Sequence, residues 1–300
     1  MDRASAFACR ASGGRKRMLN ARSSLAVVAG SLLFASGCVA APQDGADDEL
    51  AVAEDAIIWT NGDVPSFFWQ TSTQYLLQRL ATSPLVDPAT GLLTPTRLLA
   101  SDAGRKVLHY VVGCALPRGT TVSTSMPAVS FKGAIGLAPT WKAGKLGALS
   151  SQRWVTACLL QTLNGIGAKV PIRMVGSHGG LTDASAQDAV DYSIPDATMF
   201  GNIFDPAKVE VFACADDGAA AACGLSWSAF ANLRICDGSS LCGITLLGAC
   251  QDEAGADCSI NSVGKLVCRT PGNTVYAEAI STFLDETGFT ALYPSCSPPP

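Results

Sequence analysis

The sequence is poor in charge and in histidine. Of its 300 residues, 15% are charged and two are His, and the formal net charge is -4. This balance excludes the basic surface that nucleic-acid-binding proteins need. With 48% hydrophobic residues the chain can bury a core, so an intrinsically disordered chain is excluded too. The length suits one large domain or two small ones.

The apolar run at residues 25–34 is too short to cross a bilayer, which needs about 20 residues. It follows a basic segment made of Arg15, Lys16, Arg17 and Arg22 and precedes Ala35-Ser36-Gly37-Cys38. Such an order is typical of a secretory signal, and the last four residues resemble the lipobox of bacterial lipoproteins. We therefore expect residues 1–37 to be removed and Cys38 to carry acyl chains such as palmitate. An ordinary cleaved signal is the alternative, and a start at Met18 would leave residues 1–17 untranslated.

A lipidated Cys38 would anchor the protein without a transmembrane helix, since stable anchoring takes more than one acyl chain. Residues 1–38 hold six Lys/Arg and one Asp, which leaves 15 basic and 24 acidic residues, a net charge of -9. A chain this acidic is repelled by anionic headgroups and nucleic acid.

Residues 38–56 read as the lipidated Cys and an acidic tether. Val39, rather than Asp, favours the outer membrane of the cell envelope.

The remaining chain predicts an α+β fold. Residues 57–206 read as a helix-containing mixed domain, residues 207–296 as a small, disulfide-rich, loop-rich β module, and residues 297–300 as a tail. We expect helices over 67–80, from the Ser101 cap to residue 116, and over 150–164. Short strands are expected at 171–175 and 209–213, with broken strand material in 120–138 and a last periodic element at 275–284. The pattern of residues 192–204 predicts neither a helix nor a strand.

Twelve cysteines indicate an oxidising compartment. Without Cys9 and Cys38, ten remain, an even number that allows five disulfides. Cys114 and Cys158 lie on the apolar stripes of two predicted helices, which predicts a bridge between them. The other eight belong to the second region, with their pairing open: Cys214, Cys223, Cys236, Cys242, Cys250, Cys258, Cys268 and Cys296. Their spacing does not fit a zinc site, so no metal and no cofactor is expected.

Catalytic motifs are missing. The chain has no Gly-x-Ser-x-Gly elbow, P-loop, dinucleotide fingerprint or His-Glu-x-x-His. Ser177-His178-Gly179-Gly180 is similar to the His-Gly-Gly loop of esterases, which makes Ser177 and His178 candidates for a hydrolase site. A glycine-rich turn explains the same residues. Acidic pairs at 216–217 and 252–253 fit solvated loops.

Five tryptophans could stack on sugar rings. Trp141, in a predicted loop, and Trp227 are the candidates for a carbohydrate-binding surface. Packing in the core is the competing interpretation for both.

Four blocks carry a family resemblance: 110–117 (YVVGCALP), 136–141 (GLAPTW), 153–160 (RWVTACLL) and 200–204 (FGNIF). Together with the cysteine-rich tail they resemble a group of uncharacterised secreted lipoproteins that recur in myxobacterial genomes. The resemblance covers most of residues 100–285. It implies secretion and disulfides, and it implies no particular activity.

These observations favour a lipid-anchored envelope lipoprotein with a non-enzymatic binding or envelope role. The membrane is its expected partner through Cys38, nucleic acid is not, and a protein or carbohydrate ligand is open. A secreted hydrolase at Ser177 and His178, and a carbohydrate-binding module using Trp141 or Trp227, are the alternatives.

Overall fold

In the computed structural model of the chain, the described residues are 58–62, 65–181, 185–215, 218–224, 226, 229, 234–236, 243–251 and 256–298. The predictions for Cys38, the tether, Trp227, Cys242 and the two acidic pairs lie outside these residues.

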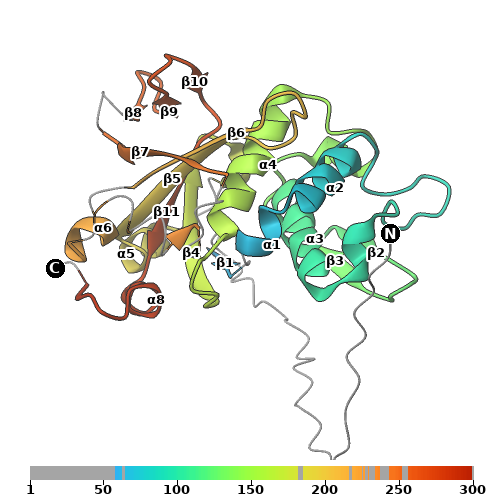
Figure 1. The fold of residues 1–300 in the computed structure, drawn as a ribbon, viewed down its shortest axis with the longest axis horizontal. Helices are drawn as coiled ribbons and strands as arrows, with labels where there is room; N and C mark the ends of the chain where they lie inside the picture. Colours follow the sequence, from blue (N-terminus) through green and yellow to red (C-terminus); the bar gives the residue numbers. More distant parts are fainter. Residues whose placement is uncertain are drawn as a thin grey trace, which may run out of the picture. The chain divides into compact units, whose positions relative to one another are not determined.

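The described elements confirm the α+β class (Figure 1). The helices are α1 (Pro65–Phe68), α2 (Thr71–Ala81), α3 (Asp102–Ala115), α4 (Leu149–Thr162), α5 (Ala186–Asp191), α6 (Ala219–Ala222) and α8 (Glu286–Leu292), with 3₁₀ turns η1 (Arg97–Ala100), η2 (Pro139–Lys142) and η3 (Gly179–Leu181). The strands are β1 (Ile58–Asn61), β2 (Thr121–Ser123), β3 (Ser130–Lys132), β4 (Val170–Gly176), β5 (Ile194–Asn202), β6 (Glu210–Ala215), β7 (Thr245–Ala249), β8 (Asp257–Ile260), β9 (Leu266–Arg269), β10 (Val275–Tyr276) and β11 (Ile280–Leu284).

The main sheet has six strands in the order β1-β4-β11-β5-β6-β7. Its neighbours are antiparallel except for the parallel pair β6 and β7. The boundary predicted after Pro206 falls between β5 and β6, which pair with each other, and β11 returns to lie between β4 and β5. The two predicted regions therefore share one sheet and one hydrophobic core. Sequence reasoning missed this because β11 comes 78 residues after β5 ends at Asn202.

Helices cover one face of the main sheet. The helix α4 packs against β5 and β11, and α3 packs against α4. Nine consecutive residues of α4, Trp154 to Thr162, are buried, because the sheet lies on one side and α3 on the other. The helix predicted over 150–164 is confirmed as α4. The predicted Ser101 cap is confirmed as well, since its side chain accepts a hydrogen bond from the Gly104 N–H.

A second, three-stranded sheet in the order β10-β9-β8 packs against the other face of the main sheet. The interface buries an aromatic cluster in which Phe200 lies 5.4 Å from Phe212 and 5.1 Å from Tyr276, between ring centroids. Two disulfides, Cys214–Cys250 and Cys258–Cys268, lie in the same interface.

The predicted Cys114–Cys158 bridge is confirmed and joins α3 to α4, with a Cα–Cα distance of 6.0 Å. Within the predicted cysteine-rich region, the described disulfides are Cys214–Cys250, Cys223–Cys296 and Cys258–Cys268. Cys236 is disulfide-bonded too.

Two local expectations need correction. The helix expected over 67–80 is broken at Trp69 and Gln70, so α1 and α2 are separate helices. The unassigned segment 192–204 contains β5, a central strand of the main sheet. It carries no alternation of apolar and polar residues because eight of its nine residues are buried, some on each face.

Candidate functional site

The turn that holds Ser177 and His178 follows β4 directly. The Ser177 hydroxyl accepts a hydrogen bond from the Leu266 N–H of β9, at 2.7 Å. This contact ties the small sheet to the end of β4, and it gives Ser177 a structural role that its place in the sequence did not indicate.

His178 is held within its own turn. Its Nδ1 accepts a hydrogen bond from the Gly180 N–H at 3.0 Å, which places the ring proton on Nε2 in the neutral form. The ring packs edge-on against Trp154, with 5.3 Å between ring centroids. Among the described residues, no carboxylate hydrogen-bonds to His178. The arrangement is that of a glycine-rich turn and assembles no nucleophile, base and acid in the part of the chain that the structure describes.

Burial lowers the pKa of His178 below its ordinary value of 6.5. The unfolded chain therefore binds a proton at this histidine in a pH window in which the folded chain does not, so stability falls as the pH drops from about 6.5 toward the folded pKa. We expect His178→Gln, which cannot be protonated, to lose less stability than the wild type between pH 7.5 and pH 5.5. Urea unfolding of both proteins at the two pH values measures the difference. Equal losses in both proteins would show that folding does not lower the pKa of His178.

Trp141 is a core residue, which corrects its interpretation as a binding aromatic. Its side chain is fully buried, its Nε1–H donates to the Ser83 carbonyl at 3.1 Å, and its ring meets Phe204 edge-on at 5.7 Å between centroids. A buried ring cannot stack on a sugar. The loop pattern around Pro139 wrongly suggested an exposed side chain, because the short turn η2 folds the Trp141 indole into the core.

A buried ion pair connects α4, β5, β11 and the C-terminal helix region. The Arg234 Nε–H donates to Asp196 Oδ2 at 2.9 Å, and both side chains are fully buried. The Tyr293 hydroxyl donates to Asp196 Oδ1 at 2.8 Å, and the Thr282 hydroxyl lies 3.1 Å from Oδ2. Burial and the Asp196 carboxylate raise the pKa of Tyr293 well above 10, so this hydroxyl stays a donor. A network this closed to solvent holds the fold together rather than binding a substrate.

A bulge in β5 divides the polar residues of the sheet between its two faces. The register of β5 and β11 shifts between Ser281 and Phe283, so that Asp196 and Ala197 together face Thr282. Asp196 consequently joins Thr282 in the buried network beneath α4. Thr198 and Ser281 pair on the opposite face, toward the small sheet, with 2.6 Å between their hydroxyl oxygens.

A cleft of about 380 Å³ opens on that opposite face, between the main sheet and the small sheet. Its walls come from strands that are distant in the sequence: Pro195 and Thr198 of β5, Ser281 and Phe283 of β11, Cys258, Ser259 and Ile260 of β8, and Leu266 of β9, closed by Gly218 and Gln251. Gly218 lies so close to β5 that a Cβ atom there would be 2.5 Å from the Pro195 carbonyl oxygen. Only glycine therefore fits at this wall.

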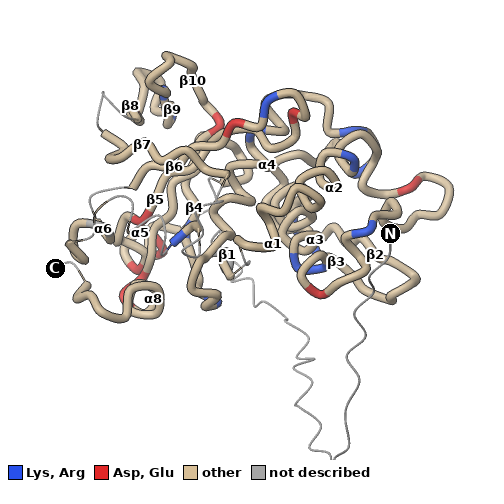
Figure 2. Tube along the Cα trace, viewed as in Figure 1, with Lys and Arg blue, Asp and Glu red and all other residues tan. Residues whose placement is uncertain are grey.

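None of the described residues that line the cleft is charged. Lys/Arg and Asp/Glu residues are scattered elsewhere along a mostly uncharged chain (Figure 2). Among the described lining residues, those with polar side chains are Thr198, Ser259, Ser281 and Gln251. A hydroxyl has one donor hydrogen and two acceptor lone pairs, so Ser281 has hydrogen-bonding capacity beyond its bond to Thr198. The cleft therefore suits a small uncharged molecule with an apolar body and a polar group.

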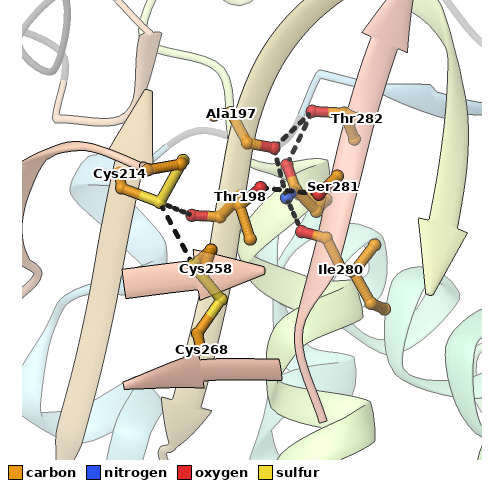
Figure 3. The surroundings of a disulfide bond; sticks show 10 residues. Ala197, Thr198, Cys214, Cys258, Cys268, Ile280, Ser281 and Thr282 are labelled. Atoms are coloured by element: carbon orange, nitrogen blue, oxygen red, sulfur yellow. Dashed lines mark hydrogen bonds between the residues drawn. A yellow bond between two sulfur atoms is a disulfide. The ribbon is translucent and has the colours of Figure 1, made fainter. Parts of the chain in front are cut away.

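Disulfide sulfur atoms lie close together beside the main sheet (Figure 3). Cys258 lines the cleft, and the Cys258 Sγ is 3.8 Å from the Cys214 Sγ. Figure 3 shows Thr198 and Ser281 beside these sulfurs, with Cys268 bonded to Cys258. The sequence predicted that these cysteines form disulfides but did not place them at a cleft. The spacing of residues along the chain gives no sign that β5, β8 and β11 come together.

Within the described residues, no group of three or more His, Cys, Asp and Glu side chains is placed to hold a metal ion. No helix among those residues is long and apolar enough to span a membrane.

In comparisons with known proteins, the chain matches no protein-family model, no curated protein and no solved structure.

Proposed function

We propose that the chain is a lipid-anchored protein of the cell envelope that binds a small uncharged ligand in the cleft between the two sheets. The observation that supports the binding role is the cleft itself, whose lining includes no charged group among the residues that the structure describes. A charged ligand would lose its hydration there without gaining a counter-charge, which is unfavourable. An uncharged ligand would bury its apolar part against Ile260, Leu266 and Phe283 and meet the hydroxyls of Thr198 and Ser281.

A matched pair of probes tests the binding role. We expect 4-fluorobenzyl alcohol to bind with a dissociation constant of about 1 mM, which corresponds to about 4 kcal/mol. 4-Fluorobenzoate has the same ring and a negative charge, so it should bind at least about tenfold more weakly, a difference of about 1.4 kcal/mol. Broadening of the ¹⁹F resonance on titration with the full-length folded protein measures both.

Two tryptophan variants locate the bound probe. Ser259 lines the cleft and Ser262 does not, although both are exposed on the β8–β9 hairpin. Ser259→Trp should fill the cleft and abolish broadening by 4-fluorobenzyl alcohol, whereas Ser262→Trp should leave it unchanged. Binding that survives Ser259→Trp, or equal binding of the two probes, would contradict the proposal.

The anchor is supported by Ala35-Ser36-Gly37-Cys38 and by the basic and apolar segments before it. In a bacterial host that matures lipoproteins, we expect the protein to incorporate an alkyne analogue of palmitate. Cys38→Ala should lose the label completely, while Cys9→Ala should retain it because residue 9 lies in the part that is removed. An unlabelled wild type, or label retained in Cys38→Ala, would refute the anchor without affecting the cleft.

A further inference from the structure

Two disulfides meet at the cleft, and their four cysteine residues differ in exposure. The exposed fractions of the residues are 8% for Cys258, 3% for Cys214 and 0% for Cys250 and Cys268. Of these four, Cys258 is the one that lines the cleft. A small thiol entering the cleft therefore reaches Cys258 before the other three.

The backbone holds the two disulfides against each other. The Cys258 N–H donates to the Cys250 carbonyl at 2.8 Å, and the Cys250 N–H donates to the Ala215 carbonyl at 3.1 Å. Cys258 also faces Cys268 directly in the β8–β9 pair. These contacts fix the Cys258 Sγ at 3.8 Å from the Cys214 Sγ, which is van der Waals contact between two sulfur atoms.

From this contact we infer that the cleft is a thiol–disulfide exchange site, in which a small thiol enters at Cys258 and the exchange passes on to Cys214–Cys250. The inference uses the same cleft as the proposed function, but it does not depend on the bound ligand.

The exchange is balanced in three steps. A thiolate of the small thiol attacks the Cys258 sulfur, which forms a mixed disulfide and releases the Cys268 thiolate. A second small thiolate attacks the small-thiol sulfur of that mixed disulfide, which releases the Cys258 thiolate and leaves the two small thiols oxidised to their own disulfide. The Cys258 thiolate then attacks the Cys214 sulfur, which forms Cys214–Cys258 and releases the Cys250 thiolate. The Cys268 and Cys250 thiolates take protons from water.

The exchange would change which elements are cross-linked. Cys258–Cys268 links two strands of the small sheet, and Cys214–Cys250 links β6 to the end of β7. The new Cys214–Cys258 bond would instead join β6 of the main sheet to β8 of the small sheet, beside the cleft. The thiol state of the surroundings would thereby set how firmly the two walls of the cleft are held together.

Limited reduction of the folded, oxidised protein tests the inference. The protein is treated briefly with 2-mercaptoethanol, quenched with acid, alkylated and mapped by mass spectrometry of the unreduced peptides. We expect alkylated Cys250 and Cys268 together with a linked Cys214–Cys258 peptide. Cys114–Cys158, whose residues are fully buried, should react at least about tenfold more slowly. Cys223–Cys296 is partly exposed, so its rate of reduction is not compared with the rates of the two disulfides at the cleft.

Two variants identify the route. Cys258→Ser/Cys268→Ser removes the entry point, so Cys214–Cys250 should become as slow to react as Cys114–Cys158. Ser259→Trp should slow the loss of Cys258–Cys268 about tenfold, and Ser262→Trp should not. Alkylation of both Cys258 and Cys268 with Cys214–Cys250 intact would overturn the exchange. Reaction rates that Ser259→Trp leaves unchanged would overturn entry through the cleft, whether or not 4-fluorobenzyl alcohol binds there.

Discussion

Asp196→Asn should lower the free energy of unfolding by about 3–5 kcal/mol, among the largest effects we expect from any single substitution in this chain. The Arg234 guanidinium is fully buried and Asp196 is its carboxylate partner, at 2.9 Å. An asparagine cannot neutralise that charge, so an unpaired cation would remain in the core. It would also present an N–H₂ group where the carboxylate accepts from both Arg234 and Tyr293. Urea unfolding, followed by tryptophan fluorescence without reductant, measures the change.

Glu210→Gln is the matched control for this substitution. It makes the same carboxylate-to-amide change in the Lys208–Glu210 pair, whose side chains are 70% and 36% exposed. An exposed pair contributes about 0–1 kcal/mol, so this variant should unfold almost like the wild type. Replacing both buried partners, as Asp196→Asn/Arg234→Met, should be less damaging than Asp196→Asn alone, because no buried charge is left. A loss below about 1 kcal/mol in Asp196→Asn would contradict the structural role of the pair.

The helices were predictable because their signals are local. Ser101 precedes an apolar stripe at Val107, Val111 and Cys114, and a cap followed by this spacing predicts a helix with one buried face. Cys158 lies on a second such stripe, so its bridge to Cys114 followed from the two patterns alone. Each of the two patterns lies within a single helix.

The strand β5 and the ion pair were not predictable in the same way. Residues of β5 are buried on both faces, and the bulge at Asp196 and Ala197 interrupts what alternation remains. Arg234 lies 38 residues from Asp196. In the sequence it lies among cysteines and glycines. A single charged residue in such a segment is normally expected to be exposed to solvent. Nothing in the spacing of the two residues indicates that they meet.

The cleft was beyond sequence reasoning for a related reason. Its described walls are uncharged residues that β5, β8 and β11 bring together only when β11 inserts between β4 and β5. Sequence reasoning looks for reactive side chains at fixed spacing, and it therefore pointed to Ser177 and His178. A site made of hydroxyls, disulfides and apolar side chains gives no such signal.

Replacing the Cys114–Cys158 bridge with two alanines should lower the free energy of unfolding by about 4 kcal/mol from chain entropy alone. The bridge closes a loop with a sequence separation of 44, so removing it frees the unfolded chain. Both residues are fully buried between α3 and α4, and loss of the sulfurs would also leave a small cavity there. We expect the measured loss to exceed the entropic value for this reason.

Cys223–Cys296 separates the two contributions. Its sequence separation is 73, so chain entropy alone predicts an effect slightly larger than that of Cys114–Cys158. Its residues are only partly buried, at the margin of the core, and alanines there would leave little cavity. If packing between α3 and α4 matters as the burial indicates, Cys114→Ala/Cys158→Ala will be the more destabilised of the two double variants in urea without reductant. The opposite order would mean that the bridge between the helices acts only by restricting the unfolded chain.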